Sequence, residues 1–112
     1  MESTRQKKVS RLIQKELAGI LIKKSVEVSP GSLVSITVVR VSPDLSFAKV
    51  FVSIFPSNNQ QDVINSINIH LPKIRYELGQ QIRRQLRIVP ELAFFIDDSL
   101  DYIDNIDRLL KS

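Results

Sequence analysis

Two strand-like runs separated by a short turn are the feature that most constrains the fold of this chain. Residues 33–42 and 47–55 are rich in Val, Ile, Phe and Thr, which favour extended structure. The sequence between them reads Ser-Pro-Asp-Leu-Ser, and Pro43 suits the second position of a tight turn because its ring fixes φ. Strands this close in sequence pair most simply as an antiparallel hairpin. In the second run, alternate residues beginning with Ala48 should form one face, and those beginning with Phe47 the other.

Apolar residues recur at helical spacing on both sides of this hairpin. The N-terminal pattern predicts an amphipathic helix of about five turns, with Ser3 or Thr4 as its cap. After the hairpin a second helix is predicted up to Pro72, which lacks the backbone donor that a helix interior needs. The pattern then continues beyond Pro72 and ends near Arg87, so we expect two helices joined at a kink, or one bent helix. The apolar positions are Val9, Leu12, Ile13, Leu17, Ile20 and Leu21, then Val63, Ile64, Ile67 and Leu71, then Ile74, Leu78, Ile82 and Leu86.

The C-terminal quarter completes a mixed architecture. Residues 92–96 predict a third strand, and Ser99 caps a short last helix with apolar residues at 103, 106, 109 and 110. Helices with a single apolar face must cover one side of such a small sheet. The length of 112 residues fits one domain. We therefore expect a single α+β domain over residues 1–112, in the order α-β-β-α-kink-α-β followed by a short helix.

Catalytic chemistry has little support in these residues. The chain has no cysteine, and its three glycines cannot build a phosphate-cradling loop. His70 is the only histidine, so we interpret it, with Pro72, as a residue of the helix kink. The acids from Asp97 to Asp107 resemble the start and solvated side of a helix more than a cation site. We expect no enzyme, no cofactor and no metal.

The N-terminus is charged, and no apolar run approaches the roughly 18 residues of a membrane span. We therefore expect a cytoplasmic protein that does not bind membranes and acts as a monomer.

The charge is distributed unevenly along the chain. Residues 1–24 carry a net charge of +5 and residues 72–90 carry +4, whereas residues 91–112 carry −4. A net charge of +4 for the whole chain hides this asymmetry, which points to a polyanionic partner.

The basic residues form two groups at helical spacing, each opposite an apolar face. In the first helix, cations occupy the first turns, where the helix dipole disfavours them by about 0.3–1 kcal/mol each, and such a placement favours a ligand role. In the second group arginines predominate, and arginine binds phosphate in a bidentate manner. The two groups predict contacts with a phosphate backbone and little reading of bases. The predicted RNA-binding residues are Arg5, Lys7, Lys8, Arg11 and Lys15, then Arg75, Arg83, Arg84 and Arg87, with Lys49 on the outward face of the second strand.

Three strings in this order and spacing resemble the ribosome-binding factor A family. They are VSxLIQxEL at 9–17, VSPDLSxAxVxVS at 41–53, and RxxPELxF at 87–94, which runs into Asp-Asp-Ser at 97–99. The resemblance implies a KH-like fold of the type with an N-terminal helix. It also implies binding to small-subunit ribosomal RNA during late maturation, especially in the cold, with assembly GTPases as partners. The family marks its helix kink with Ala-x-Gly, where this chain has His70-Leu71-Pro72. Proline can enforce a bend, but its bulk and missing N–H disfavour a close approach of RNA at the kink.

Two other classes of function stay open at this point. A protein-interaction adaptor could recruit a GTPase through the apolar and acidic C-terminus together with Phe51 and Phe55. A cation-dependent nuclease could use the aspartates of the C-terminal segment and would then require a divalent metal. Salt dependence separates the adaptor from an RNA-binding protein, because phosphate contacts weaken steeply as the ionic strength rises.

Overall fold

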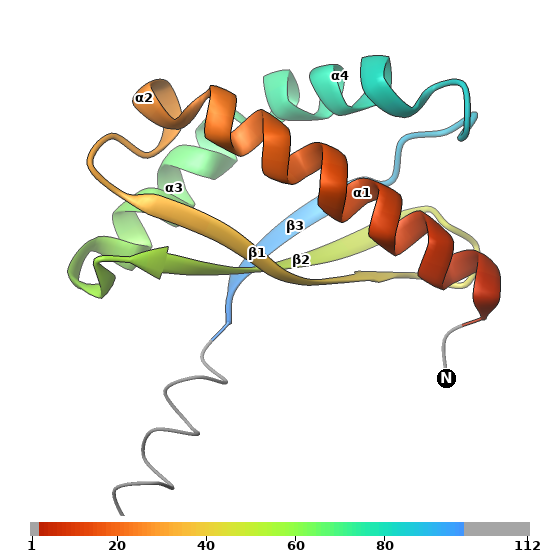
Figure 1. Ribbon diagram of the computed structural model, residues 1–112, viewed down its shortest axis with the longest axis horizontal. Coiled ribbons are helices and arrows are strands. Elements are labelled where there is room, and N and C mark those ends of the chain that lie inside the picture. Colours follow the sequence, from red (N-terminus) through yellow and green to blue (C-terminus); the bar gives the residue numbers. More distant parts are fainter. Residues whose placement is uncertain (1–2, 98–112) are drawn as a thin grey trace, which may run out of the picture.

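The computed structural model describes residues 3–97 (Figure 1). Within this range the predicted order of helices and strands is confirmed, and the predicted last helix lies outside the described residues. A short helix that the sequence did not predict, α2, follows the first one. The elements are α1 (Thr4–Lys23), α2 (Ser25–Val28), β1 (Leu33–Val41), β2 (Phe47–Phe55), the 3-10 turn η1 (Ser57–Asn59), α3 (Gln60–Ile69), α4 (Leu71–Ile82) and β3 (Glu91–Ile96).

The N-terminus of α1 is capped and attached to the sheet by two neighbouring residues. The Ser3 hydroxyl accepts from the backbone N–H of Gln6, and the Gln6 side chain accepts in return from the Ser3 N–H, which makes a capping box. The Gln6 amide also donates to the carbonyl of Val41 at 2.8 Å. Because Gln6 is buried, this bond satisfies polar groups that water does not reach. The first turn of α1 is therefore held against the end of β1.

The three strands of the described chain form one sheet in the order β1-β2-β3. As predicted, β1 and β2 are an antiparallel hairpin, with Val41 opposite Ala48 and Leu33 opposite Phe55. Strand β3 then pairs in parallel with the other edge of β2. A parallel neighbour requires a long crossover, and α3 and α4 provide it.

The described helices cover one face of the sheet, and none of them covers the other (Figure 1). The β2 residues that begin with Ala48 are all buried on the covered face, as the alternation predicts. They pack with the apolar faces of α1, α3 and α4, where residues such as Ile13, Ile67 and Leu78 are fully buried. Burying side chains of this size contributes about 1.5–3 kcal/mol each, so this layer is the main source of stability.

The predicted interruption between the two central helices lies at His70. Its backbone N–H and its ring Nδ1 both lie within hydrogen-bond distance of the Ser66 carbonyl, at 3.1 and 2.8 Å. Pro72 stands in the first turn of α4, where a backbone N–H would have no partner within the helix. The structure thus has two separate helices rather than one bent helix.

The predicted end of the later helix near Arg87 is wrong, because α4 ends at Ile82. The backbone N–H groups of Gln85 and Leu86 both donate to the Ile82 carbonyl, which turns the chain out of the helix. This turn still packs the half-buried Leu86 against the core. Because Leu86 is apolar and stands at the next helical position, the sequence pattern predicts a helix that continues past Ile82.

Candidate nucleic-acid interface

The predicted cations of α1 are all exposed. Arg5, Lys7, Lys8, Arg11 and Lys15 lie opposite the buried residues of the same helix. The first turn of α1 holds no acidic residue, so the positive end of the helix dipole adds to these charges. This half of α1 is a strongly positive surface.

Arg83, Arg84 and Arg87 are also exposed, but they belong to the segment after α4 and not to the helix itself. Arg83 is the C-cap of α4, where a cation complements the negative end of the dipole. The turn that follows α4 spreads the three guanidinium groups over an irregular segment that leads into β3.

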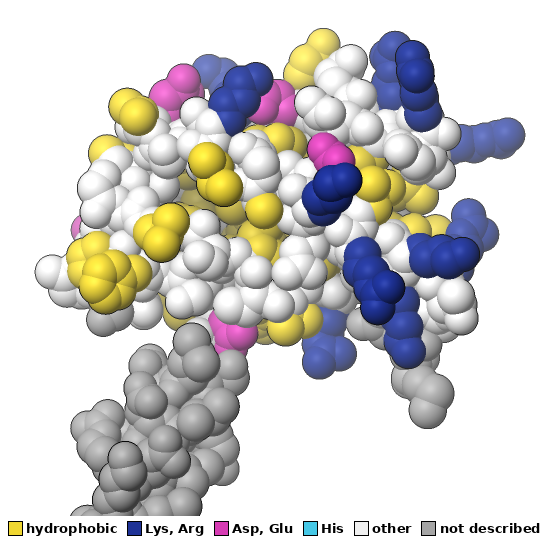
Figure 2. Space-filling model, viewed as in Figure 1, with side chains coloured by type: hydrophobic (Ala, Val, Ile, Leu, Met, Phe, Trp, Pro, Cys, Tyr) yellow, Lys and Arg dark blue, Asp and Glu magenta, His cyan; other side chains and the backbone are white. Residues whose placement is uncertain are grey.

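The two basic groups converge at one end of the molecule. Helices α1 and α4 pack against each other in opposite directions (Figure 1). Lys24, at the end of α1, forms an ion pair at 3.3 Å with Glu77, in the middle of α4. The last turn of α4 lies near Glu16 and Gly19 of α1, and the segment after α4 continues towards Arg5. Figure 2 shows most of the Lys and Arg side chains of this face at the right of the view, over the first half of α1 and the segment after α4. We call this end the basic end; it carries the first-helix cations with Arg83, Arg84 and Arg87.

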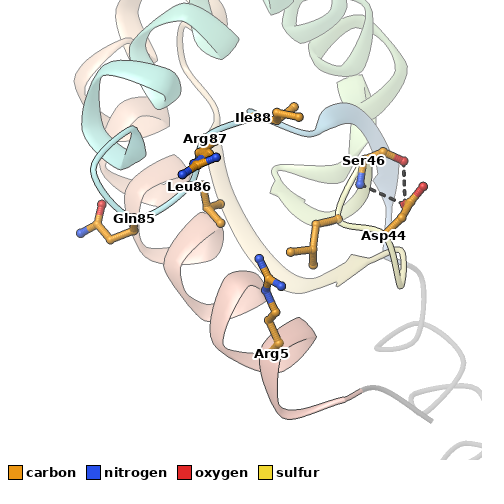
Figure 3. A pocket seen from close by; sticks show the side chains of 8 residues that line it. Arg5, Asp44, Ser46, Gln85, Leu86, Arg87 and Ile88 are labelled. Carbon is orange, nitrogen blue, oxygen red and sulfur yellow. Dashed lines mark hydrogen bonds between the residues drawn. The ribbon is translucent and has the colours of Figure 1, made fainter.

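A cavity of about 400 Å³ lies between the two groups. Arg5 lines it from α1 and Arg87 from the segment after α4, together with residues of the β1–β2 turn. Figure 3 shows side chains from these three segments bordering the same space. The other lining residues are Asp44, Leu45, Ser46, Gln85, Leu86 and Ile88.

Asp44 braces the β1–β2 turn at this cavity. Its Oδ1 accepts from the Ser46 hydroxyl at 2.7 Å, from the Ser42 hydroxyl at 2.7 Å and from the Ser46 N–H at 3.1 Å. These hydrogen bonds lower the pKa of Asp44 from 3.8 to about 2, and the bond from the Ser46 hydroxyl has the largest effect. The braced turn places Leu45 in the left-handed region, at a φ of 64°.

The cations of the basic end are not neutralised within the described residues. Among residues 3–97, the ion pair of Lys24 with Glu77 and that of Arg75 with Glu91 use no cation of the basic end. Unpaired, exposed guanidinium and ammonium groups are available to an anionic ligand.

Arg75 is placed differently from the other predicted arginines. It is half-buried, and its guanidinium donates to the carbonyls of Val89 at 3.1 Å and Pro90 at 3.3 Å. A carboxylate oxygen of Glu91 lies 4.0 Å from the same group. Arg75 therefore ties α4 to the segment before β3, and we do not count it in the basic end.

Lys49 and the helix kink also lie away from the basic end. Lys49 is exposed on the sheet face that the helices do not cover, since its neighbours Ala48 and Val50 are buried on the other face. His70 and Pro72 precede α4, whereas the basic end lies beyond its last turn (Figure 1). The structure thus does not bring these three residues together with the two basic groups.

The sequence pattern does not reveal the apolar lining of the cavity. It predicts a hairpin connection after β1 and a helix position for Leu86, and neither prediction indicates a cavity. Leu45 could not be singled out, because its left-handed backbone depends on the hydrogen bonds around Asp44.

No group of three or more His, Cys, Asp or Glu side chains in residues 3–97 could hold a metal ion. Most of the predicted aspartate cluster lies outside this range. None of the described helices is both long and apolar enough to span a membrane.

Comparison with known proteins places these features in a family. The family model described as ribosome-binding factor A matches residues 5–110. A relative from Christiangramia forsetii, named ribosome-binding factor A, is 49% identical over 111 residues, which span 98% of this chain and 85% of the relative.

Two solved structures share the fold. The crystal structure of ribosome-binding factor A from Thermus thermophilus matches with a TM-score of 0.65 and 20% identity, covering 81% of this chain and 94% of that one. A homology model of the Thermus thermophilus factor, fitted into an electron-microscopy map of a 30S complex, matches with a TM-score of 0.59 and 18% identity, covering 88% and 97%. These likenesses establish the KH-like fold. With its sequence matched over nearly its whole length, this chain belongs to the ribosome-binding factor A family.

Proposed function

We propose that this protein binds the ribosomal RNA of the immature small ribosomal subunit and supports its late maturation without catalysing a reaction. The observation that carries the proposal is the convergence of two cationic segments that have no ion-pair partner among residues 3–97, with Arg5 and Arg87 lining one cavity between them. A rigid pair of basic surfaces matches phosphates at a fixed spacing, so it recognises the shape of folded RNA. The 30S complex of the Thermus thermophilus relative supports the same kind of partner.

In this proposal the protein acts in the cytoplasm and contacts RNA mainly through phosphates. The whole chain acts as one RNA-binding domain in the cytoplasm, as a monomer, and its role includes maturation at low temperature. Phosphate contacts position the protein, and direct reading of base edges contributes little. The residues that we assign to phosphates are those of the basic end.

The test reverses two exposed charges of the basic end. Arg83→Glu combined with Arg84→Glu should lower the affinity for purified immature small subunits at least about a hundredfold, because charge-assisted hydrogen bonds contribute about 1.5–3 kcal/mol each. The melting temperature should stay nearly unchanged, since both side chains are exposed. Binding is measured by co-sedimentation at a fixed, moderate salt concentration.

A second double variant controls for the change in net charge. Lys23→Glu with Lys73→Glu alters the charge of the protein equally, but both lysines are exposed outside the basic end. This control should bind subunits with nearly the affinity of the wild type. Equal loss of binding in both variants would show a nonspecific charge effect and contradict the proposed surface.

The uncovered face of the sheet favours one alternative, a protein-interaction adaptor for an assembly GTPase. Phe51 and Phe95 pack together there with their ring centroids 5.6 Å apart, and Phe55 is 73% exposed. Apolar side chains in such a position are typical of a protein-binding surface. Phe55→Ser should leave RNA binding unchanged, and it should abolish GTPase binding only if the adaptor function is correct.

A further inference from the structure

The cavity at the basic end has an apolar wall as well as a cationic rim. Leu45 and Leu86 line it as half-buried side chains that continue the hydrophobic core towards the surface. Ile88 extends this wall into solvent and is 74% exposed. Arg5 and Arg87 border the same space. The carboxylate of Asp44 borders it at the β1–β2 turn. A ligand that suits the cavity therefore has an apolar face for the wall and negative charge for the arginine side, away from Asp44.

The turn that supplies Leu45 is held in a backbone conformation that side chains rarely adopt. At a φ of 64° a glycine would be free of strain, yet the chain places a leucine there and braces it through Asp44. The leucine side chain provides apolar surface to the cavity, which a glycine would not. Leu45 lines the cavity together with Arg5 and Leu86.

One nucleotide matches the size and chemistry of this cavity. The volume of about 400 Å³ is in the range of sites that hold small organic molecules, about 300–1,000 Å³. A base offers a flat apolar face to the leucines and the isoleucine, while guanidinium groups bind the adjoining phosphates. Away from Asp44, the cations of the rim continue onto the first half of α1 and the segment after α4, which suits a continuous phosphate backbone better than the side chains of an acidic peptide.

We infer that this cavity receives a single unstacked nucleotide of the bound RNA, with its base against Leu45, Leu86 and Ile88 and its phosphates on Arg5 and Arg87. The inference rests on the proposed function and adds a recognition rule to it. The protein selects RNA in which one nucleotide is free to leave the helix, such as a bulge. Because every base has an apolar face, the identity of that base matters little.

The experiment compares two synthetic RNA hairpins that differ by one nucleotide. One hairpin is fully paired, and the other carries a single bulged 2-aminopurine. The full-length wild type should bind the bulged hairpin about tenfold more tightly, as expected when a base gains an apolar contact. Fluorescence of the 2-aminopurine should change on binding, because the base leaves the stack for the cavity. Ile88→Ser should bring the ratio of the two affinities close to one.

The chain offers a matched control for this substitution. Ile69 is 75% exposed, close to the value for Ile88, but it lies at the end of α3 and outside the cavity. Ile69→Ser should keep the full preference for the bulged hairpin. Both isoleucines are exposed, so both variants should fold as the wild type does, which circular dichroism and thermal melting check.

The possible results separate the cavity inference from the proposed function. If the wild type binds both hairpins equally, or if Ile88→Ser keeps the preference, the cavity inference is wrong and RNA binding stands. If the wild type binds neither hairpin nor the small subunit, both are wrong. Binding of an acidic peptide containing phenylalanine that Ile88→Ser abolishes, while Ile88→Ser leaves hairpin binding unchanged, would also overturn the inference and assign the cavity to a protein ligand.

Discussion

At the scale of single residues, Asp44 shows how one carboxylate holds a functional turn. It is exposed, and three hydrogen bonds to its Oδ1 close the chain around Leu45. These bonds favour the ionised form, which is why the pKa of Asp44 is lowered to about 2. The geometry of the cavity wall therefore depends on the charge of this side chain.

The pKa gives a prediction on the acid side. A carboxylate with a lowered pKa in the folded state stabilises the fold above its unfolded value of 3.8, and this contribution is lost as the pH falls through about 2. The NMR shift of the Ser46 amide should therefore titrate with a midpoint near 2. Asp44→Asn should remove the transition. A midpoint at or above 3.8 would contradict the hydrogen-bonded turn.

At the scale of the elements, Arg75 fastens α4 to the segment that leads into β3. Its two carbonyl partners, Val89 and Pro90, belong to the stretch that must reverse direction between the helix and the strand. Pro90 is fully buried. If the Arg75 guanidinium were removed, the Pro90 carbonyl would lose a hydrogen-bond donor that water cannot easily replace. Arg87, three residues before Pro90, is positioned through this connection.

Removing the Arg75 guanidinium should therefore cost stability. Arg75→Met keeps the apolar stem, and we expect the free energy of unfolding to fall by about 1–3 kcal/mol because charged hydrogen bonds to two carbonyls are lost. Urea denaturation measures this difference. The control Arg84→Met replaces an exposed arginine and should change stability by less than about 0.5 kcal/mol. Unchanged stability in Arg75→Met together with a loss of subunit binding would return Arg75 to the phosphate-binding residues.

At the scale of the whole molecule, the basic end and the exposed phenylalanines lie on different surfaces. The basic end is formed where α1 begins and the segment after α4 runs, whereas exposed phenylalanines lie on the uncovered face of the sheet. A phosphate-binding protein releases counterions on association, so its affinity falls as salt rises. An apolar contact shows little of this dependence.

The salt dependence of subunit binding should therefore depend on the basic end. For the wild type, the logarithm of the affinity should fall linearly with the logarithm of the salt concentration, by about 0.7–0.9 per phosphate contacted. Replacing Arg83 and Arg84 by Gln should reduce the slope by about one to two, since two contacts are removed. Fluorescence anisotropy over a salt series measures both slopes. A shallow slope in the wild type would favour the protein-interaction alternative.

What the sequence by itself determined is the local structure. The β-branched runs and the turn at Pro43 predicted the hairpin, and the alternation in β2 predicted its buried face, because these depend on neighbouring residues alone. The apolar spacing predicted α1, and Pro72 predicted the interruption between α3 and α4, for the same reason. The apolar spacing could not locate the end of α4. The turn after Ile82 directs Leu86 towards the core, as a continued helix would also do.

Only the tertiary structure decided which distant residues share a site. The antiparallel packing of α1 and α4 brought Arg5 beside Arg87, and the β1–β2 turn added Leu45 to the same cavity. It also gave Arg75 a role inside the fold and left Lys49 on another face. Such placements depend on how whole elements pack around one core, and the spacing of residues along a single helix or strand carries no record of that packing.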